Sequence, residues 1–402
     1  MCKLCPGGGH SVLSRRQLLK LAGMFTAAGA LPLLSRFNRA MAAEPGAPLR
    51  IGYLPLTDAT PLLVAHQRGL FEAQGLEVDR PRLFRGWDQL VEAFLSGNVN
   101  VVHLLSPMAL WARYGSGFPT RTVAWNHING SALTVSLGRG VEDFADLGGN
   151  TLAIPFWYSI HNVVLQYLLR ERGLEAIVDG KPGPDQVRLV VMAPADMLPG
   201  LATGRIAGYI VAEPFCGAAE LHGVGKILRF TGDVWRGHAC CVVQMHERDL
   251  EQRPEWTQKV VNAIVEAQAW ILDHREDTVR LLSKDEPARY TPHTRDTLAR
   301  TLLPDAELHQ SYLQSGAIQH AEWGEQRIDF QPYPYPSYTE RLVELLRDTR
   351  VRGDSRFLAD LDPGEVARDL VDDRFVKSAI EAVGGPTVFG QQGYVREEVI
   401  RS

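Results

Sequence analysis

Short apolar segments alternate with amphipathic ones along most of the chain, and this alternation restricts the fold more than any other feature. Leu49 to Leu54 is typical of a buried strand, and Pro61 is placed to open the first turn of a helix. The same alternation predicts further strands at 100–105, 121–125, 132–136, 151–154, 187–192 and 208–211. Strands and helices joined by short connections predict an α/β fold whose sheets are mostly parallel and covered on both faces.

The length of the chain predicts more than one lobe. It has 402 residues, whereas a single core stops growing at about 250–300 residues. We expect a first lobe over residues 49–133 and a second over 134–236. The segment 237–402 is expected to return to the first lobe and to end in a helical wrap. The crossings near Leu133 and Trp235 are expected to act as hinges.

The first 42 residues have the pattern of an export signal. Arg15 and Arg16 precede 14 uncharged residues, Leu21 to Leu34, and Ala40-Met41-Ala42 follows as a cleavage site. A helix of that apolar length spans about 21 Å, less than the ~30 Å hydrocarbon core of a membrane. We therefore predict a twin-arginine signal peptide over residues 1–42 and a mature protein in the periplasm.

The net charge divides unevenly between this segment and the remainder. The whole chain carries −5, and its first 42 residues hold six Lys or Arg and no acid, so the remainder carries −5 − 6 = −11. An acidic body argues against nucleic acid as a partner. An anionic ligand would have to be captured by a local site.

The cysteines do not indicate a disulfide framework. Cys2 and Cys5 fall within the predicted signal peptide, which leaves Cys216, Cys240 and Cys241. We expect Cys240 and Cys241 to lie in a buried strand, where a free cysteine behaves as a small apolar residue.

Common signatures of enzymes are missing from the sequence. We find no G-x-G-x-x-G, no Walker-type loop, no H-E-x-x-H and no G-x-S-x-G, and we predict that the chain is not an enzyme. Polar residues do mark the starts of several predicted helices, where free N–H groups can face a ligand at the carboxyl ends of parallel strands. These starts are Asp58/Thr60, Trp87-Asp88, Ser106-Pro107 and Ser159.

Several segments together follow a recognisable order. They are Ile51 to Leu62 with Gly69-Leu70-Phe71-Glu72, Ser96 to Met108, Asn129-Gly130-Ser131-Ala132, Phe156 to Asn162, Val211 to Phe215, and Tyr333-Pro334-Tyr335-Pro336. In this succession the chain resembles the nitrate- and bicarbonate-binding proteins of ABC importers over residues 49–385. The resemblance implies a two-lobed periplasmic binding protein of the type II fold with a helical C-terminal extension. It also implies closure on a small oxyanion and delivery to a permease driven by an ATPase.

The resemblance nominates ligand-binding residues position by position. Trp87 would present its indole N–H, and His161 would donate to the anion from the start of a helix. Arg236 occupies the place of a cationic contact, and Ser131 that of a glutamine which donates to nitrate. Asn129 and Tyr158 lie in two of the matching segments and join the candidates.

Two departures from the family pattern leave the ligand open. Ser131 is shorter than the glutamine it replaces, and the tract Phe156-Trp157-Tyr158 is bulkier than the usual Gly-rich stretch. A sulfonate, taurine or a pyrimidine precursor of thiamine therefore stays an alternative to nitrate. A pyrimidine-forming enzyme on the same scaffold and a secreted sensor stay as alternatives of another class. No cofactor is expected, apart from a calcium ion that Glu213 could help to hold.

Overall fold

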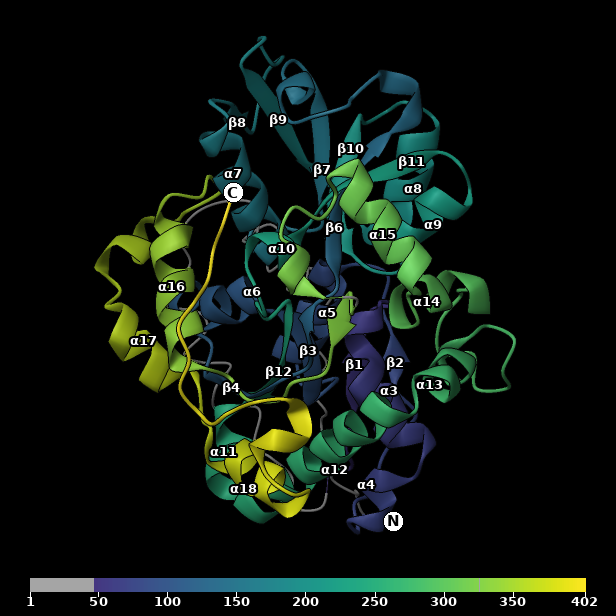
Figure 1. Cartoon of the computed structure of the whole chain (residues 1–402). Helices are drawn as coiled ribbons and strands as arrows, with labels where there is room; N and C mark the ends of the chain where they lie inside the picture. The colour runs from purple at the N-terminus through teal and green to yellow at the C-terminus, as the bar shows by residue number, and fades with distance from the viewer. Residues whose placement is uncertain (1–46, 325) are drawn as a thin grey trace, which may run out of the picture.

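The computed structural model describes residues 47–324 and 326–402 and shows two lobes, each built around its own sheet (Figure 1). The predicted signal peptide lies outside the described residues. One continuous set of buried apolar side chains extends through both lobes and across their junction. Within the described ranges, no helix combines the length and the apolar character needed to cross a membrane.

The first lobe contains a five-stranded sheet in the order β2-β1-β3-β12-β4. Its strands are β1 (Ile51–Tyr53), β2 (Arg82–Leu83), β3 (Val101–Leu105), β4 (Thr120–Trp125) and β12 (Cys241–His246). β12 is antiparallel to both of its neighbours, and β2, β1 and β3 are parallel. The amino end of β12 therefore lies at the edge where the other strands end.

The second lobe contains a six-stranded sheet in the order β11-β6-β10-β7-β9-β8. Its strands are β6 (Ser131–Ser136), β7 (Thr151–Ile154), β8 (Glu175–Ile177), β9 (Gln186–Val191), β10 (Gly208–Ala212) and β11 (Gly225–Phe230). Here β6 is the antiparallel strand, and β10, β7, β9 and β8 are parallel. In each sheet the antiparallel strand, β12 in the first and β6 in the second, is thus the strand by which the chain enters from the other lobe.

The chain crosses between the sheets through residues 126–130 and returns through residues 231–240. The predicted lobe boundary after residue 133 falls inside strand β6, which belongs wholly to the second sheet. The chain therefore passes to the second sheet before Ser131. Asn129 and Gly130 both have positive φ, 58° and 74°, which turns the chain at this point. The short strand β5 (Ile128–Asn129) pairs with β13 (Ile328–Asp329) and ties the crossing to a later segment.

Helices cover both sheets, as the sequence predicts. Around the first sheet lie α3 (Thr60–Gln67), α4 (Leu70–Ala73), α5 (Trp87–Leu95), α6 (Ser106–Leu110), α11 (Glu247–Gln252), α12 (Pro254–Asp273) and α13 (Arg275–Leu282). Around the second lie α7 (Ile160–Glu171), α8 (Pro194–Ala202), α9 (Phe215–Leu221) and α10 (Thr231–Val234). Two later helices, α14 (Arg295–Leu302) and α15 (Ala306–Ser315), lie beside the second lobe, where α14 packs on α9 (Figure 1).

The C-terminal segment wraps around one flank of the molecule (Figure 1). Its helices are α16 (Pro336–Arg347), α17 (Pro363–Leu370) and α18 (Arg374–Ala382), and α18 packs along α12. Asp369 of α17 forms an ion pair with Arg113 of the first lobe, with 2.6 Å between nitrogen and oxygen. The last residues then bond to the return crossing, where Arg401 N donates to Val234 O at 2.8 Å.

One expected strand is reduced to a single bridge. The segment Glu77-Val78-Asp79 reads as the start of a strand, but only Val78 pairs, with Leu49. Strand β2 begins after Pro81 instead, since proline has no N–H to donate to a ladder. The segment Val141 to Leu147, whose sequence pattern favours a short helix, forms only a 3₁₀ turn at Ala145–Leu147.

Candidate functional site

Polar residues from the first lobe gather at the carboxyl edge of its sheet. Asp58 lies in the 3₁₀ turn Thr57–Ala59 that follows β1, and His127 follows β4. Cys240 and Cys241 enter at the amino end of β12, where Cys241 pairs with Leu105 at the end of β3. Because β12 runs against its neighbours, residues about 70 to 180 positions apart meet at one edge.

The second lobe contributes Ser131 and His161 to the same place. Ser131 is the first residue of β6 and pairs with Ala212 at the carboxyl end of β10. His161 lies in the first turn of α7, which is capped as predicted: the Ser159 hydroxyl accepts from the backbone N of Asn162 at 3.1 Å. The cap fixes the start of α7 and with it the position of the imidazole.

Ser131, His161 and Cys240 contact one another. The Ser131 hydroxyl lies 3.0 Å from His161 Nε2 and 3.6 Å from Cys240 Sγ. Cys240 Sγ lies 3.7 Å from the same imidazole nitrogen. Cys240, which lies in the return crossing, therefore contacts two elements of the second lobe: the start of β6 and the first turn of α7.

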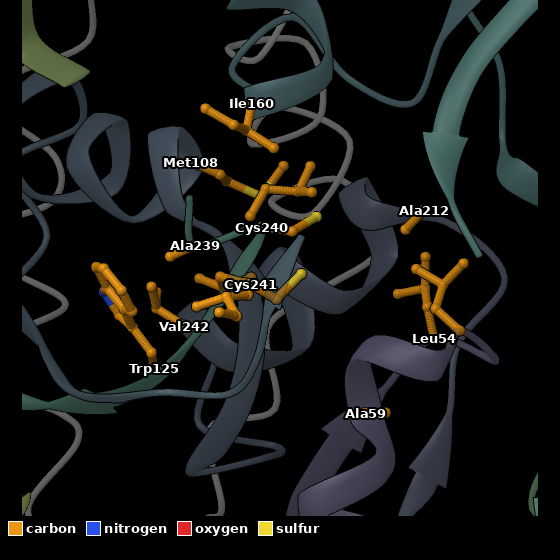
Figure 2. Close-up of a cluster of buried hydrophobic side chains, with 14 of the residues drawn as sticks. Leu54, Ala59, Met108, Trp125, Ile160, Ala212, Ala239, Cys240, Cys241 and Val242 are labelled. Carbon is orange, nitrogen blue, oxygen red and sulfur yellow. The ribbon is translucent and has the colours of Figure 1, made fainter. Parts of the chain in front are cut away.

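Asp58 connects the remaining members. Its Oδ2 accepts from Cys241 Sγ at 3.0 Å and from Cys240 Sγ at 3.4 Å, and His127 Nε2 lies 3.2 Å away. We refer to these six residues (Asp58, His127, Ser131, His161, Cys240 and Cys241) as the interlobe cluster. Figure 2 shows both cysteine sulfur atoms turned to the same side within an apolar surrounding that includes Met108, Ile160 and Leu54.

The interlobe cluster is buried, yet several of its polar atoms have no partner. His161 is 0% exposed and Ser131 is 1% exposed. Asp58 Oδ1, His161 Nδ1 and both ring nitrogens of His127 make no hydrogen bond. A buried polar atom without a partner costs about 1–3 kcal/mol, so this many at one point indicates a place for a ligand.

Trp87 contacts the first-lobe sheet through His103. It opens α5, is 2% exposed, and its ring centroid is 5.3 Å from that of His103 on β3. Its indole Nε1 is buried and makes no hydrogen bond. His103 Nε2 accepts from the backbone N of Leu54 at 2.9 Å, which leaves its Nδ1 unpartnered.

Burial governs the electrostatics of these groups. It lowers the pKa of His103 to about 3, so this imidazole is neutral. It raises the pKa of Asp58. For His127, burial alone lowers the pKa, but the charge and proximity of Asp58 outweigh it and raise the pKa to about 10. Asp58 and His127 therefore form an ion pair inside the protein.

Three of the nominated residues lie away from the interlobe cluster. Asn129 accepts at Oδ1 from Gly237 N at 3.0 Å and so connects the two crossings. The Tyr158 hydroxyl donates to Asp354 O in the C-terminal wrap at 3.1 Å. Arg236 is exposed and donates to Glu322 O at 3.3 Å, since the neighbouring Trp235 takes the buried position. Of the nominated residues, Ser131 and His161 therefore contact each other, and Trp87 contacts His103. Asn129, Tyr158 and Arg236 have other partners.

Glu213 is buried at the end of β10, outside the interlobe cluster. One carboxylate oxygen accepts from Gly217 N at 3.0 Å, and burial raises the pKa of the group to about 7. Its backbone O accepts from both N and Oγ1 of Thr57, at 2.9 and 3.0 Å. Glu213 thus bonds one lobe to the other through its main chain.

An open pocket of about 680 Å³ lies between the lobes beside the interlobe cluster. Leu54 forms part of its wall, and the backbone N of Leu54 donates to His103 Nε2. His103 therefore lies one residue behind the wall of the pocket. Its charged lining residues are three cations and one acid: Arg85, Lys284, Arg289 and Asp285. The entrance is therefore positively charged on a chain whose body is acidic.

The sequence prediction missed the roles of His127, Cys240 and Cys241, and it considered Asp58 only as a helix cap. In the structure the side chain of Asp58 caps nothing and turns into the interlobe cluster. Its partners stand at positions 127, 240 and 241, so no local spacing could reveal them. The paired cysteines were the available signal.

Comparison with known proteins places this geometry in context. The nitrate/nitrite binding protein NrtA of Synechocystis is 26% identical over 259 residues, covering 59% of this chain and 56% of that protein. The bicarbonate transport ATP-binding protein CmpC of Synechocystis is 29% identical over 244 residues, 56% of this chain and 35% of that protein. The chain thus spans less than two thirds of either relative.

The fold agrees with that of periplasmic binding proteins. The crystal structure of the periplasmic nitrate-binding protein NrtA from Synechocystis PCC 6803 superposes with a TM-score of 0.70 at 22% identity, covering 87% of this chain and 92% of that one. The predicted two-lobed α/β fold is confirmed. The NMT1-like family model matches residues 42–283, which is more than half of the chain, and the chain therefore belongs to the NMT1-like family.

Proposed function

We propose that this chain is the solute-binding component of an ABC importer and captures a small anion, nitrate first, between its two lobes. The observation that carries the proposal is that two nominated groups, Trp87 Nε1 and His161 Nδ1, are each buried and have no hydrogen-bond partner. The relatives named above, a nitrate/nitrite binding protein and an ATP-binding protein of bicarbonate transport, support the same class of cargo and partner.

Capture would proceed by opening and closing of the lobes. Trp87 and His161 are buried, so an anion can reach them only when the lobes separate at the crossings 126–130 and 231–240. On closure the anion exchanges its water for fixed N–H donors, which avoids leaving a charge unpaired in the interior. The positive entrance of Arg85, Lys284 and Arg289 would draw the anion toward the junction.

Nitrate comes first because the relative NrtA is a nitrate/nitrite binding protein. Ser131 keeps a sulfonate as the second candidate. Its hydroxyl lies 3.0 Å from His161 and extends less far than an amide would, which leaves more room for a larger anion.

A thermal-shift screen of the purified protein tests the proposal. The panel contains nitrate, nitrite, bicarbonate, taurine, alkanesulfonates and pyrimidines, each also run on the variant His161→Ala. A ligand at 100 times its Kd should add about 2.7 kcal/mol to the free energy of unfolding. We expect stabilisation by nitrate in the wild type and at most about half as much in the variant, because its Kd should be at least about 10-fold higher. Stabilisation by pyrimidines only, or by no anion, would contradict the proposal.

We also propose that the protein reaches the periplasm by the twin-arginine route. Arg15 and Arg16 before a short apolar run support this route. The variant Arg15→Lys/Arg16→Lys should accumulate in the cytoplasm, as judged by fractionation, whereas the wild type should be exported. Equal export of both would exclude the route.

A further inference from the structure

We propose that Asp58, His127, Cys240 and Cys241 bind one thiolate-preferring divalent cation of the zinc class. This metal site is independent of the anion capture proposed above, and neither proposal needs the other. Its four donor groups come from the first lobe and the two crossings, so a bound cation would fasten the junction from the first-lobe side.

The positions of the donor atoms suit one small cation. One ligand atom from each of the four residues lies within 4.8 Å of all the others. Asp58 Oδ2 lies 3.0 Å from Cys241 Sγ, 3.2 Å from His127 Nε2 and 3.4 Å from Cys240 Sγ. In a tetrahedral zinc site with the usual bond lengths, ligand atoms are about 3.3–3.8 Å apart. The three distances to Asp58 Oδ2 thus lie close to this range, and no two of the four ligand atoms are more than 4.8 Å apart.

The kinds of donor select the class of cation. Two cysteine sulfurs, one imidazole and one carboxylate are a set that zinc and similar late transition ions prefer. Calcium and magnesium take six or more oxygen ligands, and this site offers only the oxygens of Asp58. The cation expected here is thus different from the calcium ion that the sequence associates with Glu213.

Unpartnered atoms within the four residues provide a second, independent observation. All four residues are buried, and Asp58 Oδ1 and both ring nitrogens of His127 make no hydrogen bond. His127 Nε2 is 3.2 Å from Asp58 Oδ2 but is not aligned for a hydrogen bond, so its ring is free to present that nitrogen to a cation. A core that needed only packing at this point would hold apolar residues.

The alternative is a purely structural arrangement in which both thiols simply donate to Asp58. The two thiol contacts to Oδ2 satisfy one carboxylate oxygen, but they leave both ring nitrogens of His127 without a hydrogen bond. Cation binding releases the two thiol protons and the extra proton of the His127 imidazolium, and the cation then gives both His127 and the carboxylate a partner. The experiment below separates the two arrangements.

The full mature chain, purified with its thiols reduced and freed of metal, is titrated with Co²⁺ and then with Zn²⁺. We expect one equivalent of Co²⁺, with the intense visible bands of a tetrahedral site and a thiolate charge-transfer band in the near ultraviolet. Zn²⁺ should displace Co²⁺ at one equivalent, measured by elemental analysis after desalting. Less than 0.1 equivalent of retained Zn²⁺, or octahedral Co²⁺ spectra, would overturn the proposal.

Variants assign the site to these residues. Cys240→Ser/Cys241→Ser should lose the charge-transfer band and weaken Zn²⁺ binding by at least 100-fold. The matched control is Cys216→Ser, because Cys216 is also a buried free cysteine but bonds to the backbone of β6 and β10. If the double variant does not fold, Asp58→Asn serves instead, with an expected loss of at least 10-fold. Unchanged binding in the variants, or equal loss in the control, would overturn the assignment. Nitrate titration of metal-free protein, run in parallel, tests the anion site separately.

Discussion

The hydroxyl of Ser131 lies 3.0 Å from Nε2 of His161, although one begins a strand and the other lies in the first turn of a helix. This contact holds the imidazole so that Nδ1, the nitrogen without a partner, is the one left for a ligand. Ser131 therefore positions His161 and does not have to touch the anion itself.

Ser131→Ala should weaken nitrate binding without abolishing it. The substitution removes one neutral hydrogen bond to His161, worth about 1 kcal/mol, which corresponds to about 5-fold in Kd. Calorimetric titration measures the change, and Ser131→Thr should restore part of the affinity because it keeps the hydroxyl. A loss of 100-fold or more would mean that Ser131 contacts the anion directly.

Removing the positive charges at the entrance should slow association. Arg85, Lys284 and Arg289 line the pocket between the lobes, and charges at such a rim act on the rate of encounter. The triple substitution to Gln should lower the association rate about 10-fold at low salt and change dissociation little, as measured by stopped-flow fluorescence. Lys181→Gln, in the β8–β9 connection of the second lobe, is the control. An effect on dissociation alone would contradict the role in steering.

Glu213 should make the protein less stable as the pH rises. Burial raises its pKa from 4.5 to about 7, so the folded state favours the protonated form. The protonated carboxyl contributes to the free energy of unfolding. This contribution is complete below about pH 4.5 and is lost as the pH rises through 7. The difference of 7 − 4.5 = 2.5 pH units limits it to at most about 3 kcal/mol. Urea unfolding of Glu213→Gln should therefore match the wild type at pH 4.5 and exceed it at pH 8. A difference that is the same at both pH values would show that the carboxyl does not titrate in this range.

The C-terminal residues should restrain the return crossing. Trp235 Nε1 donates to Glu398 Oε2 at 2.7 Å, and Arg236 N donates to Val399 O at 3.0 Å. Deleting residues 394–402 should increase hydrogen exchange of the amides at 231–240 by at least 10-fold, because several bonds of about 1 kcal/mol each are lost. Mass spectrometry measures the exchange, and the β8–β9 segment should not change. Unaltered exchange at 231–240 would exclude a restraining role.

The fold could be predicted well because it depends on local patterns. The alternation of strands and helices sets the two sheets, and the capped start of α7 places His161 where the sequence predicts it. The lobe boundary is harder to predict, because an apolar residue such as Leu133 is compatible with a strand of either sheet. What moves the crossing before Ser131 is the positive φ of Asn129 and Gly130.

The site could be predicted only in part. Trp87, Ser131 and His161 are marked by helix and strand starts; Ser131 and His161 contact each other, and Trp87 contacts His103. Arg236 follows a tryptophan, and the sequence alone does not show which of the two side chains is buried. In the structure Trp235 is buried, and Arg236 is therefore exposed. The thiol and carboxylate contacts of Asp58 depend on the antiparallel course of β12, which no local pattern encodes.

Calorimetric titration of nitrate into the wild type, Trp87→Ala and His161→Ala tests the central claim most directly. We predict one site in the wild type and a loss of at least about 10-fold in each variant, because hydrogen bonds to a charged ligand are worth about 1.5–3 kcal/mol. His222→Ala and Trp256→Ala, which lie on α9's end and on α12, should bind as the wild type does. Equal affinity in all five proteins would contradict the account.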